Sequence, residues 1–128
     1  MIRRATGLAL AVLATMAVAE APAGAAAVPS DLGFLGLAGV PNEGFVVYGQ
    51  VTSPKPKCVA GRKITVTLVS LEGDKVRDTA VSSTHGGWLA HFKSNAVPDI
   101  DQVKMVLQKR STTKGGKTLK CDDDKLAV

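Results

Sequence analysis

The sequence has few aromatic residues, only two cysteines and no apolar run after residue 27 that is long enough to span a membrane. Phe, Trp and Tyr make up 4% of the 128 residues, against thirteen Gly and six Pro. This scarcity argues against a large aromatic-lined pocket, and the turn-forming residues argue against a helical bundle. The composition therefore predicts one small domain of short strands and turns.

Residues 1–27 have the form of a secretory signal peptide. A short basic start precedes an apolar run from Leu8 to Ala19, which is shorter than the ~20 residues that a membrane-spanning helix needs. Small residues suited to cleavage end at Ala19 and again at Ala27, and the sequence leaves both positions open. An uncleaved anchor is the alternative. We expect a secreted or cell-wall-associated protein with no membrane span after removal of the leader.

The two cysteines are Cys58 and Cys121. Exported proteins meet oxidising conditions, so we expect one disulfide rather than two free buried thiols. A metal site is not expected, because His85 and His91 lie far from both cysteines in the sequence. The acidic run 122–124 supplies too few ligands for Ca²⁺, which takes about six to eight oxygens, so we expect a solvated turn there.

Short runs of alternating apolar and polar residues follow residue 44. In the clearest run, Ile64, Val66 and Leu68 share one face and the residues between them share the other, as in a half-buried antiparallel strand. Turn signals such as Glu72-Gly73-Asp74 separate the runs. We expect about seven strands, over 45–51, 63–68, 76–82, 88–92, 102–108, 118–121 and 126–128.

The segment 28–44 lacks a sustained period and carries two Pro and four Gly. It therefore predicts a linker or a loosely docked N-terminal segment. The domain proper is expected over 45–128. Its fold class is predicted to be all-β, a seven-stranded antiparallel β-sandwich of transthyretin-like or immunoglobulin-like form with one disulfide.

Several segments together resemble a known family. They are Tyr48-Gly49-Gln50-Val51, the run from Cys58 to Val66, Asp78-Thr79 with Ser82, the turn Gly86-Gly87-Trp88, and Cys121 after a Gly-Gly hairpin. In these residues the chain resembles small secreted bacterial domains of the transthyretin-like, carboxypeptidase-regulatory-like β-sandwich type. The resemblance covers roughly 44–128 and carries no catalytic signature. The related hydroxyisourate hydrolases depend on a C-terminal Tyr-Arg-Gly-Ser element, whereas this chain ends Lys125-Leu126-Ala127-Val128.

Histidine is the natural candidate for acid–base catalysis, because it titrates near neutrality without special tuning. His85 lies in a Gly-rich turn, and His91 alternates with Ala90 and Phe92, so it should face solvent. No nucleophile elbow accompanies either residue. We therefore expect a protein that is not an enzyme and needs no cofactor. The alternative is a small secreted hydrolase that uses His85 or His91.

Basic residues gather around both cysteines. If the disulfide forms, we expect it to bring two clusters together as a patch for an anionic partner. The patch comprises Lys55, Lys57, Arg62, Lys63, Lys109, Arg110, Lys114, Lys117 and Lys120. The expected partner is an anionic cell-surface polymer or another exported protein. Nucleic acid is not expected, because the protein is exported and lacks interleaved aromatics. The alternative reading is lysine used for solubility and edge protection. The predicted function is a non-catalytic binding or structural module at or outside the cell surface.

Overall fold

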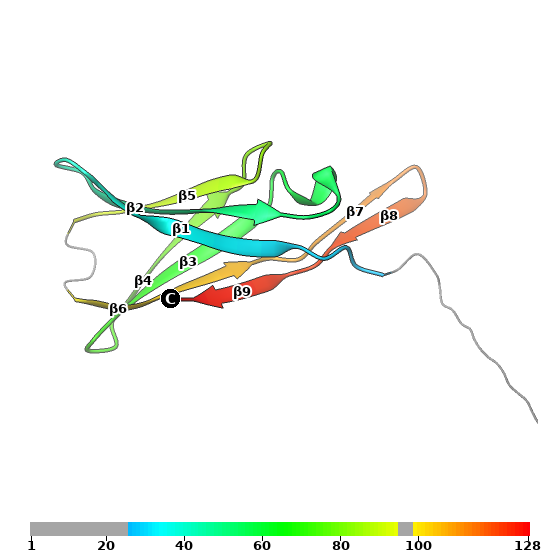
Figure 1. Ribbon diagram of the computed structural model, residues 1–128. Helices are drawn as coiled ribbons and strands as arrows, with labels where there is room; N and C mark the ends of the chain where they lie inside the picture. The colour runs from blue at the N-terminus through cyan, green and yellow to red at the C-terminus, as the bar shows by residue number, and fades with distance from the viewer. Residues whose placement is uncertain (1–25, 95–98) are drawn as a thin grey trace, which may run out of the picture.

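The computed structural model describes residues 26–94 and 99–128, so almost all of the predicted leader lies outside the described residues. Within these ranges the chain forms nine strands and one short 3-10 helix, η3, at Pro56–Cys58 (Figure 1). The strands are β1 Asp31–Val40, β2 Gly44–Thr52, β3 Lys63–Ser70, β4 Lys75–Val81, β5 Gly87–Phe92, β6 Ile100–Leu107, β7 Arg110–Lys114, β8 Lys117–Cys121 and β9 Asp124–Ala127. In this part of the chain, no helix has the length and hydropathy to cross a membrane.

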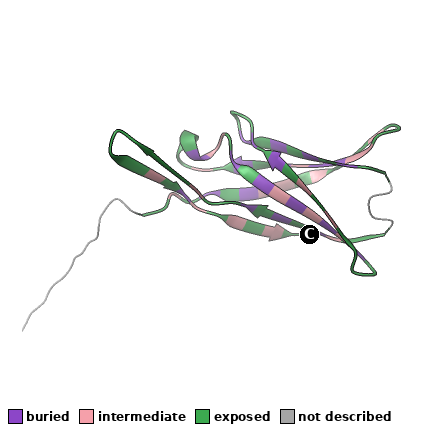
Figure 2. Ribbon diagram, turned by 180° about the vertical axis from the view of Figure 1, so that it is seen from behind, coloured by how far each residue is buried: buried purple, intermediate pink, exposed green. Residues whose placement is uncertain are grey.

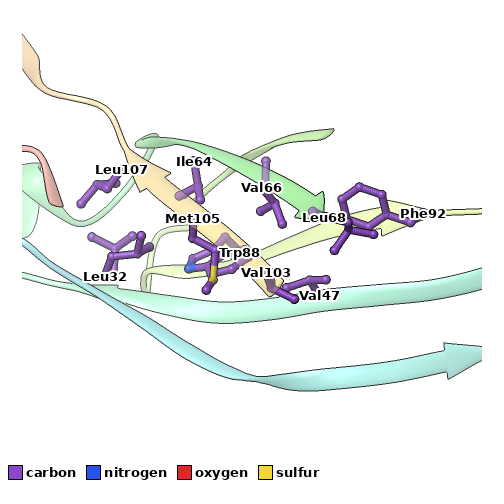
Figure 3. Packing of buried hydrophobic residues seen from close by; sticks show 13 residues of the cluster. Leu32, Val47, Ile64, Val66, Leu68, Trp88, Phe92, Val103, Met105 and Leu107 are labelled. Carbon is purple, nitrogen blue, oxygen red and sulfur yellow. The ribbon is translucent and has the colours of Figure 1, made fainter. Parts of the chain in front are cut away.

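Two antiparallel sheets pack face to face. One has the order β1-β2-β5 and the other the order β4-β3-β6-β9, while β7 and β8 form a separate hairpin at one end. The apolar residues predicted to share faces meet between the sheets, because alternate side chains of a strand point to the same side (Figure 3). The buried cluster comprises Leu32, Val47, Val51, Ile64, Val66, Leu68, Ala80, Trp88, Ala90, Phe92, Val103, Met105 and Leu107. The predicted fold class is confirmed.

The predicted number of strands was wrong: the described chain has nine strands instead of seven. The two additional strands are β1 and β7. The pairing of β1 with β2 shifts register between Phe34 and Gly36, so no single alternation runs through its glycine-rich sequence. All five residues of β7 are polar and four of them are exposed, so no alternation of apolar residues indicates this strand in the sequence.

The segment 28–44 is not the predicted linker or loosely docked segment, because β1 occupies most of it. β1 pairs with β2 from Asp31 to Val40, and the Leu32 side chain is buried in the core. Just before β1, Val28 N donates to Lys120 O at 2.8 Å. The segment therefore completes one sheet and closes the domain against β8.

Gly49 on β2 lies very close to the backbone of β1 and to the Trp88 side chain of the core. A Cβ atom there would overlap the carbonyl oxygen of Gly33 and lie 2.5 Å from Cζ2 of Trp88. We expect Gly49→Ala to lower the free energy of unfolding by about 2 kcal/mol, measured by urea denaturation. Gly39→Ala on β1 is the matched control, because its Cβ would meet nothing within 4 Å. Equal losses in both variants would contradict the steric explanation.

Candidate functional site

The predicted disulfide is confirmed, and it joins Cys58 to Cys121 with a Cα–Cα distance of 5.5 Å. Cys58 ends η3 in the connection between β2 and β3, and Cys121 is the last residue of β8. Both cysteines are buried. The bridge therefore fastens the loop around η3 to the base of the β7–β8 hairpin, at one end of the sandwich (Figure 1).

The β7–β8 hairpin continues the pairing that β6 and β9 begin. Leu107 pairs with Asp124 in the β6–β9 ladder, and Arg110 pairs with Cys121 in the β7–β8 ladder. Two residues on each strand lie between these two pairs, so both ladders share one register. Between them the pairing is interrupted on both strands. This interruption lies beside the disulfide.

Arg62 fills the interruption. Its Nη2 donates to Gln108 O at 2.9 Å and to Asp122 O at 2.7 Å, one carbonyl from each strand. The backbone amides at the same place have other partners: Gln108 N donates to Lys63 O at 3.0 Å and Asp122 N to Val28 O at 2.9 Å. The guanidinium therefore links two strands where their own ladder is broken.

The rest of the Arg62 guanidinium holds the loop and the N-terminal segment. Its Nη1 donates to Cys58 O at 2.8 Å and to Ser30 Oγ at 2.9 Å. The Arg62 side chain is completely buried. Of its three guanidinium nitrogens, only Nε has no acceptor among the described residues. One buried arginine thus joins four chain segments through four hydrogen bonds.

Among the described residues, the four acceptors of the Arg62 guanidinium are three backbone carbonyls and one hydroxyl, and none of them is a carboxylate. Burial is the main cause that lowers the pKa of Arg62, and the charge of Arg110 lowers it further, whereas Asp122 raises it. Arginine nevertheless stays protonated near neutral pH, because its ordinary pKa is so high. A full positive charge is therefore stabilised here by carbonyl dipoles.

Arg110 makes a second link between the hairpin and the loop. Its Nη1 donates to Ala60 O at 2.9 Å and to Gly61 O at 3.0 Å, and its Nη2 donates to Lys57 O. These bonds fix the loop at a set position relative to β7. They also engage the guanidinium, so Arg110 is less free to bind an external anion than the lysines nearby.

A groove with a volume of about 920 Å³ lies between this loop and the hairpin. The hairpin contributes one face, because Arg110, Thr112 and Lys114 alternate with residues that point the other way. We call this feature the basic groove. It is lined by Lys55, Pro56, Lys57, Ala60, Arg110, Thr112, Lys114, Lys117, Thr118 and Leu119. Among these described lining residues none is Asp or Glu.

The nine residues predicted to form the basic patch do not all lie at one place in the structure. Five of them line the basic groove: Lys55, Lys57, Arg110, Lys114 and Lys117. The side chain of Arg62 is inside the domain, which excludes it from any surface patch. Lys63, Lys109 and Lys120 are exposed but lie outside the groove lining, and Lys120 alternates onto the opposite hairpin face.

The two histidines are exposed, and neither is among the described residues lining the groove. His85 lies in the turn before β5, and His91 lies near the end of β5. The strand between Gly87 and His91 spans roughly 13 Å at the usual rise per residue. The imidazoles therefore stand at opposite ends of one strand and do not converge.

The acidic run 122–124 has structural contacts instead of forming a cluster. Asp124 Oδ2 accepts from Leu32 N at 2.9 Å, and Asp124 Oδ1 accepts from Lys125 N at 2.9 Å. In the described residues, no group of three or more His, Cys, Asp or Glu side chains is placed to hold a metal ion.

Sequence reasoning assigned Arg62 to the surface and missed its structural role, although a signal was present. Strict alternation along β3 places Arg62 on the same face as Ile64, Val66 and Leu68, which is the buried face. A charge on a buried face needs hydrogen-bond partners. Those partners come from segments distant in sequence, so only the folded chain reveals them.

Comparisons of this chain with protein-family models, with curated proteins and with solved structures found no match.

Proposed function

We propose that this protein is an exported, non-catalytic β-sandwich module that binds an anionic polymer at or outside the cell surface through the basic groove. The observation that carries the proposal is the groove lining. Lys55, Lys57, Lys114 and Lys117 are exposed there, and the lining contains no carboxylate to neutralise them. Such a concentration of one charge favours partners of the opposite charge.

The presence of several lysines in one groove favours a polymer over a single small anion. One exposed ion pair contributes only about 0–1 kcal/mol, so a lone anion would be held weakly by any one lysine. A polymer engages several lysines at once and gains from the release of their counterions and its own. Pro56, Ala60 and Leu119 add apolar contact surface between the charges.

Two further features support this proposal. The Cys58–Cys121 disulfide supports a location outside the cytosol, because such bridges persist in oxidising compartments. The packing of two antiparallel sheets is compatible with the transthyretin-like resemblance, which we retain as a proposal. Arg62, Arg110 and the disulfide hold the loop against the hairpin, so the groove walls are fixed before a ligand arrives.

The test is a charge-neutralising triple variant, Lys57→Gln with Lys114→Gln and Lys117→Gln. We expect its dissociation constant for long-chain inorganic polyphosphate at 50 mM salt to rise about tenfold or more, because several ammonium–phosphate contacts are lost. Fluorescence anisotropy of a labelled probe gives the affinity. The same measurement at 200 mM salt should show a weaker salt dependence for the variant than for the unmodified protein.

The matched control neutralises three exposed lysines outside the groove lining, Lys93, Lys109 and Lys120, with Gln at each position. It removes the same net charge and should change the affinity less than threefold. Equal weakening in both triple variants would show that net charge, and not the groove, governs binding. Absence of binding by the unmodified protein at 50 mM salt would reject the proposed function.

A further inference from the structure

The solvent side of the four-stranded sheet carries a second set of cations. Ile64, Val66 and Leu68 of β3 are buried, so the alternate residues of β3 face outward. Cross-strand partners project to the same side of a sheet, and the strand pairing therefore identifies the whole outer face. Figure 2 shows buried residues alternating with more exposed ones along these strands.

Five cations stand on this face, and we call it the cationic sheet face: Lys63, Lys75, Arg77, Lys104 and Lys125. All five are exposed. The paired positions between them hold Thr65, Thr67, Thr79, Val69, Val81, Gln102, Val106 and Ala127. These paired positions, all within the described chain, include no Asp or Glu.

The acidic residues of the same strands do not offset this charge. Asp78 pairs with the buried Val66, and its Oδ2 accepts from His91 N of the other sheet at 3.0 Å. Asp124 pairs with the buried Leu107. Asp101 lies at the register shift near the start of β6, at the edge of the face. The positive charge of this face is therefore not neutralised by carboxylates on the same face, which favours an anionic partner.

Strand pairing aligns two of these cations in a line perpendicular to the strands. Thr67 pairs with Arg77 on β4 and with Lys104 on β6, so the two cations flank one hydroxyl in a single row. Their Cα atoms are about 10 Å apart at the usual strand spacing. On β9, Lys104 pairs with Ala127, and Lys125 lies two residues away from that position, diagonal to Lys104. The aligned row therefore covers three strands, and Lys125 extends it diagonally onto the fourth.

We propose that the cationic sheet face binds a linear polymer carrying phosphate or sulfate groups, laid across the strands over Arg77, Thr67, Lys104 and Lys125. The guanidinium fork and the hydroxyl are suited to tetrahedral oxyanions, because both donate hydrogen bonds to their oxygens. Each contact is weak alone, so repeated charges are required.

The surrounding charges favour this direction and this partner. Glu72 and Asp74 lie in the turn between β3 and β4, and Asp99 and Asp101 lie at the beginning of β6. A polyanion running along the strands would meet these carboxylates, whereas one crossing from Arg77 to Lys104 stays among the cations and approaches a carboxylate, that of the exposed Asp123, only beside Lys125. A planar anionic bilayer would cover the carboxylates as well, which argues against a membrane as the partner.

The cationic sheet face and the basic groove share no residue. The inference is therefore independent of the proposed function.

The test neutralises Arg77, Lys104 and Lys125 with Gln, and it uses long-chain polyphosphate and dextran sulfate as probes. We expect the dissociation constant to rise about tenfold or more at 50 mM salt, and the log–log salt slope to fall by about two to three. The Lys93, Lys109 and Lys120 control variant should change the affinity less than threefold.

A second variant, Thr67→Val, keeps the volume and the β propensity but removes the hydroxyl donor. We expect it to weaken polyphosphate binding about fivefold and to leave the binding of poly-glutamate of equal charge less affected. We expect every variant to fold, because these side chains lie on the outer face of the sheet. Circular dichroism checks this.

The outcomes separate the two sites. Loss of affinity in the groove variant alone would overturn this inference and leave the proposed function standing. Loss in the sheet-face variant alone would support the inference and reject the groove. An equal loss in the control variant, or tighter binding to anionic phospholipid vesicles than to either polymer, would overturn the proposal for a polymer on this face.

Discussion

Removal of the Cys58–Cys121 disulfide is expected to lower the free energy of unfolding by about 4 kcal/mol. The two cysteines are 63 residues apart in sequence, so the bridge excludes a large number of extended conformations from the unfolded chain. Net stabilities of small domains are only about 5–15 kcal/mol. The bridge therefore accounts for a large share of the stability, and urea denaturation of Cys58→Ala/Cys121→Ala measures it.

Reduction of the unmodified protein is the control for this prediction. Dithiothreitol opens the bridge but keeps both sulfur atoms in the core, whereas the alanine variant also loses their packing. We expect the two preparations to agree within about 1 kcal/mol, because the chain-entropy model assigns the effect to the unfolded state. A reduced protein that loses less than about 1 kcal/mol would contradict the prediction.

Arg62→Met is expected to lower the free energy of unfolding by about 3 kcal/mol. The substitution removes four hydrogen bonds from a charged donor and leaves the carbonyls of Cys58, Gln108 and Asp122 without it. The cost is smaller than four such bonds in isolation, because the burial of the charge is relieved at the same time. Thermal and urea denaturation measure the change.

Two variants separate the contributions to this loss. Arg62→Lys keeps the charge, but one ammonium lacks the planar fork that reaches both strands, so we expect a loss of about 2 kcal/mol. Ser30→Ala removes a single acceptor and should cost about 1 kcal/mol. If Arg62→Lys were as stable as the unmodified protein, the fork geometry would be irrelevant and our description of the junction would be wrong.

Much of the fold was predictable because it depends on local alternation. The buried faces of β3, β5 and β6 follow a strict period of two in the sequence, and most connections between strands contain a Gly or an acidic residue. The strand β1 was not predictable in this way. Its register shift at Phe34 and its glycines break the alternation, and its stability as a strand comes from pairing with β2.

The candidate sites were predictable only as an excess of positive charge. The sequence placed lysines near both cysteines, and the structure arranges Lys55, Lys57, Lys114 and Lys117 around one groove. Arg77 and Lys104 share a row across the sheet, and Lys125 lies diagonal to it, although the three strands are distant in the chain. Nothing in linear spacing indicates such a row, because strand order in the sheet decides which residues are neighbours.

The sequence by itself determined the all-β class, the buried faces of the strands and the partners of the disulfide, since each follows from local periodicity or from there being only two cysteines. The tertiary structure decided the position of the charges. Arg62 is inside because alternation along β3 points it inward, where the break between the two ladders provides two acceptors and Cys58 and Ser30 provide the other two. The other cations lie in a groove or across a sheet because long-range strand pairing brings distant residues together.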